Sequence, residues 1–182
     1  STLKKVLDEN RKSIKELLDM SRRVLEKLRE ILRRLEEETR EVDEKSERIV
    51  TTLEELIKAG TDKRRIKEEL DRALKESEDM VRDSSRKLEE VLEEARRVVE
   101  DSSRKLRRSL EELKKVVRDK VEDEDKAKKV IDEVRKSVKR LEEENERVLR
   151  DVERLVREVE KKNRESEKRN RKLVEELRRK LK

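Results

Sequence analysis

The sequence predicts an all-α fold: a single-chain antiparallel (up-down-up) three-helix bundle of long, nearly straight helices with coiled-coil-like packing. Charged residues make up 58% of the chain and hydrophobic residues 30%, with no Pro and no aromatic residue. Most of the sequence is Glu, Lys, Arg and Leu, which favour helix. The apolar residues recur at steps of three and four, which is the spacing of one helical face. This spacing favours long helices over the disorder that a highly charged composition alone would suggest.

Two breaks in the apolar pattern divide the chain into three parts of similar length. Gly60 is the only glycine, and it can supply the left-handed residue that closes a helix. Thr61 or Asp62 can then cap the next helix. The apolar spacing lapses a second time before an acidic stretch, where Asp123 or Asp125 can cap a helix whose first turn carries negative charge. Both breaks are too short to be flexible linkers.

These breaks predict helices near 2–59, 62–120 and 124–182. Short connections force neighbouring helices to run antiparallel, which gives the up-down-up order. No composition shift or linker-like stretch separates the three parts. We therefore expect one elongated helical-bundle domain covering residues 1–182.

An internal repeat predicts that the helices are straight rather than strongly supercoiled. The six residues at 83–88 recur at 101–106, eighteen positions later, and the same offset separates Ser21 from Thr39. Eighteen residues make five turns of an α-helix, so the repeat returns to the same face of an uncoiled helix.

Small polar residues interrupt the apolar line at four levels of the expected bundle. With connections centred near residues 61 and 122, residue x of the first helix lies level with about 122 − x of the second and x + 122 of the third. At each of the four levels, all three helices carry Ser, Thr or Asn. We name each expected layer after one member: the Asn145 layer (Ser21, Ser102, Ser103, Asn145), the Asn163 layer (Thr39, Ser84, Ser85, Asn163), the Asn170 layer (Ser46, Ser77, Ser166, Asn170) and the Ser137 layer (Asn10, Ser13, Ser109, Ser137).

Buried polar side chains need one another, because an unpaired buried hydroxyl or amide costs about 1–3 kcal/mol. Asn both donates and accepts, so it can bridge hydroxyls on two other helices. Satisfied layers would also penalise any register that separates their members. The alternative is that these residues face solvent, and Thr51 and Thr52, which find no polar partner at their level, are consistent with it.

The chain resembles de novo designed helical bundles with buried hydrogen-bond networks. The resemblance rests on the restricted set of residue types, the polar layers and segments such as Lys87–Ala95 (Lys-Leu-Glu-Glu-Val-Leu-Glu-Glu-Ala), and it covers the whole chain. It implies a designed structural scaffold with no natural biochemical activity and no native compartment, soluble in the cytoplasm of an expression host. The family also includes heterodimers in which three helices accept a fourth, and caged switches. This chain departs from the switches because it has no separate latch-like helix.

The composition argues against the other function classes. Without Cys or His there is no thiol nucleophile, imidazole base or ordinary zinc or haem ligand, so we expect no enzyme activity, metal or cofactor. No apolar run approaches the roughly 20 residues that span a bilayer, and we expect no membrane binding. Residues 161–182 hold 11 Lys or Arg against 4 Glu. Without aromatic residues to stack on bases, we expect no specific nucleic-acid binding, only weak, salt-sensitive association.

Two readings of the apolar surface remain open. In the first, the chain is a closed monomer that requires no partner. In the second, it is an interaction module whose groove accepts a fourth helix or a second copy. The first helix has the widest apolar stripe, with pairs such as Leu17/Leu18 and Leu56/Ile57. The third helix has no apolar residue between Val159 and Leu173. A bundle missing a helix should have wide stripes on two helices, which favours the closed monomer.

Overall fold

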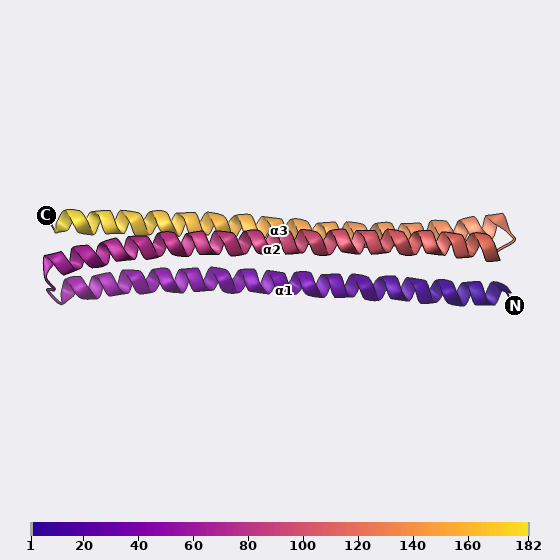
Figure 1. The fold of residues 1–182 in the computed structure, drawn as a ribbon, viewed down its shortest axis with the longest axis horizontal. Coiled ribbons are helices and arrows are strands. Elements are labelled where there is room, and N and C mark those ends of the chain that lie inside the picture. The colour runs from indigo at the N-terminus through magenta and orange to yellow at the C-terminus, as the bar shows by residue number, and fades with distance from the viewer. Residues whose placement is uncertain (1, 182) are drawn as a thin grey trace. The chain divides into compact units, whose positions relative to one another are not determined.

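The computed structural model describes residues 2–181. It leaves aside the side chains of Thr2, Leu3, Val6, Leu7, Asn10, Ile14, Leu17, Ser21 and Leu32. The chain forms three helices, α1 (Thr2–Lys58), α2 (Lys63–Lys120) and α3 (Glu124–Lys180). Figure 1 shows them as three unbroken ribbons joined by two short connections. The predicted all-α three-helix bundle is confirmed, and the expected boundaries lie within two residues of the observed ones.

The first connection is closed by Gly60, whose φ of 63° lies in the left-handed region. The Gly60 amide donates to the Ile57 carbonyl (3.3 Å), and the Thr61 amide donates to the Leu56 carbonyl (3.5 Å). These two bonds form a Schellman motif, which satisfies carbonyls left unpaired at the end of α1. The backbone there requires a residue that tolerates positive φ, which explains the only glycine of the sequence.

The second connection ends at a side-chain cap. Asp123 Oδ1 accepts hydrogen bonds from the backbone amides of Asp125 (3.1 Å) and Lys126 (3.4 Å). These amides belong to the first turn of α3 and have no partner within the helix. Of the two caps that the sequence allowed, Asp123 is therefore the one used.

The chain divides into two compact units that cut across all three helices. Unit 1 comprises Ser1–Ile31 and Glu93–Val152, and unit 2 comprises Leu32–Leu92 and Glu153–Lys182. Each helix passes from one unit into the other without a break. The expectation of one domain over residues 1–182 stays a prediction.

In unit 1, α2 and α3 enclose a continuous apolar core, and α1 contributes the buried side chains Val24, Leu28 and Ile31. The cluster between α2 and α3 consists of Leu106, Leu110, Leu113, Val117, Ala127, Val134, Val138 and Leu141. Burying each fully enclosed leucine is worth about 1.5–3 kcal/mol. At the solvent side, Lys120 of α2 forms an ion pair with Glu9 of α1 (3.1 Å).

In unit 2, all three helices contribute to one core cluster. Its members are Leu53 of α1, Ile66, Leu70 and Ala73 of α2, and Val174 of α3. Within this unit, buried polar residues stand along the same line as the apolar ones, and they form the candidate site.

Candidate functional site: buried polar layers

The Asn170 layer joins all three helices of unit 2. The Asn170 amide nitrogen donates to Ser46 Oγ of α1 (2.9 Å) and to Ser77 Oγ of α2 (3.1 Å). Ser46 Oγ also lies 2.8 Å from Ser166 Oγ, in a hydroxyl pair that either serine can donate. All four side chains are buried. The sequence places these four residues at one level, and the structure brings them into one hydrogen-bonded group.

The Asn163 layer is joined between α2 and α3. The Asn163 amide nitrogen donates to Ser84 Oγ at 2.7 Å, and both residues are buried. Thr39 behaves differently from the expectation, because its hydroxyl donates to the Leu35 carbonyl one turn earlier in α1 (2.9 Å). A helical threonine always has that carbonyl within reach, so the local bond competes with a distant partner. Ser85 is half-buried beside Ser84.

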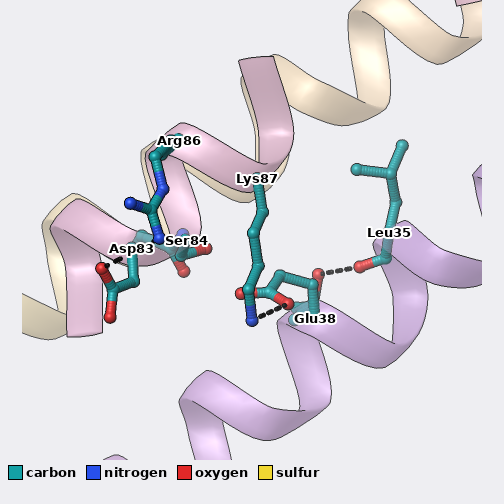
Figure 2. Close-up of polar contacts among 8 residues, drawn as sticks. Leu35, Glu38, Asp83, Ser84, Arg86 and Lys87 are labelled. Atoms are coloured by element: carbon teal, nitrogen blue, oxygen red, sulfur yellow. Dashed lines mark hydrogen bonds and ion pairs between the residues drawn. The ribbon is translucent and has the colours of Figure 1, made fainter. Parts of the chain in front are cut away.

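Ion pairs stand at the solvent side of this layer. Figure 2 shows Lys87 of α2 reaching Glu38 of α1 near Ser84, while Arg86 turns to Asp83 on its own helix. Lys87 Nζ lies 3.5 Å from Glu38 Oε2, and the Glu38 side chain is only 16% exposed. The Lys87 side chain therefore spans the α1–α2 boundary of unit 2 one turn from the buried serine.

The Asn145 layer lies in unit 1 and is also joined between α2 and α3. The Asn145 amide nitrogen donates to Ser102 Oγ at 3.0 Å, and Asn145 is fully buried. Its carbonyl oxygen accepts no hydrogen bond from any residue that the structure describes. The side chain of Ser21, the expected α1 member, lies outside the described residues. Ser103 is half-buried next to Ser102.

Among the described side chains, no hydrogen bond joins the members of the Ser137 layer across helices. The Ser137 hydroxyl donates to the Glu133 carbonyl of its own helix (3.2 Å), which is the same local bond that Thr39 makes. Ser13 and Ser109 are half-buried, and the side chain of Asn10 lies outside the described residues.

One register accounts for the hydrogen bonds between α2 and α3. The residue numbers add to 247 in Ser102–Asn145 of unit 1 and equally in Ser84–Asn163 and Ser77–Asn170 of unit 2. The level rule from the sequence gives about 244 for such pairs. A helical side chain leans toward the N-terminus of its helix. Each Asn of α3 therefore reaches a serine about one turn nearer the α2–α3 connection.

A shallow groove between α1 and α3 of unit 2 exposes the edge of the Asn170 layer. The groove has a volume of about 580 Å³, and its lining includes Ser46, Ser166 and Asn170 together with the apolar side chains Val50 and Leu173. A second groove of about 500 Å³ lies between α1 and α2 of the same unit, with Ile49, Leu53, Ala73 and Met80 in its lining. Both grooves are open clefts between helices rather than enclosed sites.

The described residues offer little for acid–base or metal chemistry. Within them, no group of three or more acidic side chains could hold a metal ion, and no helix is apolar and long enough to cross a membrane. A hydrogen bond from Lys114, together with its positive charge, holds the pKa of the Glu111 carboxyl below its usual value. An exposed carboxylate that is easier to ionise than usual is a poor proton donor at neutral pH.

Comparisons with known proteins identify a similar fold. No protein-family model matches the chain, and no curated protein sequence matches it significantly. Among solved structures, a "Computationally designed three helix bundle" is similar over 98% of this chain and 90% of its own, with a TM-score of 0.59 and 19% sequence identity. At that identity the likeness supports the three-helix-bundle fold.

Proposed function

We propose that the chain is a computationally designed structural scaffold with no natural biochemical activity, in which buried polar layers set the register of the helices. The bonding of Asn170 carries this proposal. Its single amide reaches serines on both other helices, although 124 and 93 residues separate the partners. A scaffold of this kind requires no partner, metal, cofactor or membrane.

The polar layers favour one register because any other register leaves buried polar side chains without hydrogen-bond partners. Sliding α3 by one turn would face Asn163 with Leu88, which is fully enclosed in the present register, and Asn170 with Val81. Each polar group stranded in this way costs about 1–3 kcal/mol. Apolar layers alone would tolerate such a shift more easily, since one leucine contact resembles the next.

A designed origin is supported by the consistency of the sequence with one fold at every level. Helix propensity, apolar spacing, the Gly60 turn and the Asp123 cap all favour the same three helices. The similar solved bundle, itself described as computationally designed, agrees with this origin. We propose that the expected layers extend to α1 of unit 1, with Ser21 a member of the Asn145 layer and Asn10 a member of the Ser137 layer. The Asn145 carbonyl, which accepts no hydrogen bond from any described residue, supports the first assignment.

The test replaces Asn145, Asn163 and Asn170 with Leu, alone and together, so that the triple variant keeps no buried asparagine of the three bonded layers. We expect helicity by circular dichroism to stay intact and thermal stability to be equal or higher, because apolar burial replaces polar burial and each serine can bond a carbonyl of its own helix. Register is then measured with spin labels on Arg82→Cys and Glu165→Cys, two exposed positions in a chain without native cysteine. We expect one narrow distance in the parent and a broad or multiple distribution in the triple variant.

The matched control is Val138→Leu with Val156→Leu, which enlarges two buried apolar side chains of α3 and keeps every layer. This control should keep the narrow distance. A narrow, unchanged distance in the Asn variant would overturn the register proposal. Loss of helical folding in that variant would instead mean that the layers supply stability rather than specificity.

A second candidate is an interaction module that accepts a fourth helix or a second copy. It is favoured by the groove between α1 and α3 of unit 2, where Val50 and Leu173 are partly exposed beside the Asn170 layer, and by Ile57, which is 38% exposed. Light scattering over a hundredfold concentration range separates the two candidates. A constant mass of 22.1 kDa supports the closed scaffold, whereas a mass that rises with concentration supports the module.

A further inference from the structure

The end of α3 in unit 2 carries a row of exposed cations that the scaffold does not use. Its members are Lys161, Lys168, Lys172 and Arg179, at steps of seven, four and seven. Nine residues make two and a half turns and reach the opposite face of a helix. Accordingly, the buried Asn163 and Asn170 lie nine positions from members of this row. The four side chains, which we call the α3 cation row, therefore face directly away from the core.

The charges of the row are not taken up by acidic side chains, unlike those of Arg171 and Arg178. Arg171 pairs with Glu78 of α2 (3.6 Å), and Arg178 pairs with Asp71 of α2. No member of the row makes such a pair with any residue that the structure describes. The charge balance is also local: residues 161–180 hold ten cations against four acids, a net charge of +6.

Another part of α3 provides an internal comparison. Lys129, Lys136, Arg140 and Arg147 repeat the same steps of seven, four and seven in unit 1, and all four are exposed. Their surroundings are neutral, because residues 129–148 hold six cations and six acids. Two rows of identical spacing on one helix thus differ in the charge around them.

We infer that the α3 cation row is a docking surface for the phosphodiester backbone of double-stranded nucleic acid. From Lys161 to Arg179 the row covers 18 residue steps, about 27 Å of helix. Duplex DNA presents one negative charge per roughly 1.7 Å of its axis. The chain has no aromatic residue to stack on an unpaired base. Recognition therefore rests on backbone phosphates and is independent of sequence. This surface is separate from the polar layers and does not depend on the scaffold proposal.

The same chemistry argues against an anionic membrane as the partner. A helix that lies on a bilayer inserts an apolar face between the lipid headgroups. The apolar face of α3 is turned into the core, where Val174 is only 1% exposed. The outward face carries long cationic side chains beside the exposed acids Glu165 and Glu175 and has no large apolar side chain to insert, which suits a rigid polyanion better than a lipid surface.

The experiment measures fluorescence anisotropy of a labelled 25-base-pair duplex between 20 and 200 mM NaCl. Four phosphate contacts predict a slope of about −3.6 in log Kobs against log salt, or a loss of about a hundredfold in affinity from 50 to 200 mM. The row variant K161Q/K168Q/K172Q/R179Q should lose most of both the affinity and the slope. The matched variant K129Q/K136Q/R140Q/R147Q removes the same charge at the same spacing, and it should bind within threefold of the parent.

Three outcomes would overturn the inference: no binding at 20 mM NaCl, equal loss in both variants, or binding to phosphatidylserine vesicles but not to the duplex. Equal loss would assign the effect to net charge rather than to the row. Circular dichroism of both variants checks that the helices are intact. If the quadruple row variant is misfolded, the pair K161Q/K172Q replaces it, with K129Q/R140Q as its control and half the change in slope expected.

Discussion

Asn170 and Ser46 are hydrogen-bonded at 2.9 Å across 124 residues of sequence. The bond ties α3 to α1 inside unit 2, and the second bond of the same amide, to Ser77, ties α3 to α2. One side chain thus fixes the level of all three helices. Among the described residues, Asn163 bonds only Ser84, so it fixes the level of two helices.

This difference predicts unequal costs for the same truncation. Asn170→Ala removes two hydrogen bonds and Asn163→Ala removes one, while the two variants leave cavities of similar size at buried positions of one helix. With about 1 kcal/mol per bond, we expect Asn170→Ala to lower the free energy of unfolding by about 1 kcal/mol more than Asn163→Ala. Guanidinium unfolding followed by circular dichroism measures both. Equal losses would mean that the second bond contributes nothing.

The Asn145 carbonyl accepts no hydrogen bond from any described residue, which predicts a role for Ser21. If the Ser21 hydroxyl donates to that carbonyl, Ser21→Ala leaves a buried acceptor unpaired and lowers the free energy of unfolding by about 1–3 kcal/mol. Thr52→Ala, at an exposed position of the same helix and outside every layer, is the control and should change stability by less than about 0.5 kcal/mol. Comparable changes in the two variants would exclude Ser21 from the Asn145 layer.

The local bond of Thr39 predicts that its hydroxyl is dispensable. Thr39→Val keeps the shape of the side chain and removes only a bond to the Leu35 carbonyl, which remains bonded within the helix. We expect a change in unfolding free energy within about 0.5 kcal/mol. Thr51→Val is the control, because Thr51 makes the same bond to Glu47 at an exposed position. A loss above about 1 kcal/mol at Thr39 alone would reveal a partner across the bundle.

The left-handed backbone at Gly60 predicts a graded effect of substitution. No atom lies within 4 Å of a Cβ placed there, so only backbone strain opposes a side chain. Gly60→Ala should lower the free energy of unfolding by about 1–2 kcal/mol. Gly60→Asn should cost less, because Asn tolerates positive φ. Thermal unfolding of the two variants tests this order, and an alanine variant as stable as the parent would contradict it.

Much of the fold follows from the sequence because its signals are local. The glycine at position 60 and the acidic cap at position 123 mark the connections, and apolar spacing supplies the core line. The expected layers name both serines of each pair, but only Ser84 and Ser102 continue the apolar line at helical steps, whereas Ser85 and Ser103 do not. The paired serines are accordingly the buried ones.

The remaining details depend on which of several available partners each polar side chain bonds, and residue spacing alone does not decide this. Thr39 and Ser137 stand at the expected levels, yet their hydroxyls bond carbonyls of their own helices. The shift of the α2–α3 pairs by three residues arises from the lean of the side chains. Ion pairs such as Lys87–Glu38 require the final register, because many other cations and acids alternate along the same faces.

The short connection between α2 and α3 has a consequence for the order in which the molecule folds. Ser102 and Asn145 enclose 43 residues, whereas Ser46 and Asn170 enclose 124. The entropy cost of closing a loop grows with the logarithm of its length, which makes the longer closure about 0.9 kcal/mol more expensive. The Ser102–Asn145 bond between α2 and α3 therefore forms before the Ser46–Asn170 bond between α1 and α3. Pulse-labelling hydrogen exchange would detect this order as protection of the amides around Asn145 before those around Asn170, and equally early protection around Asn170 would contradict it.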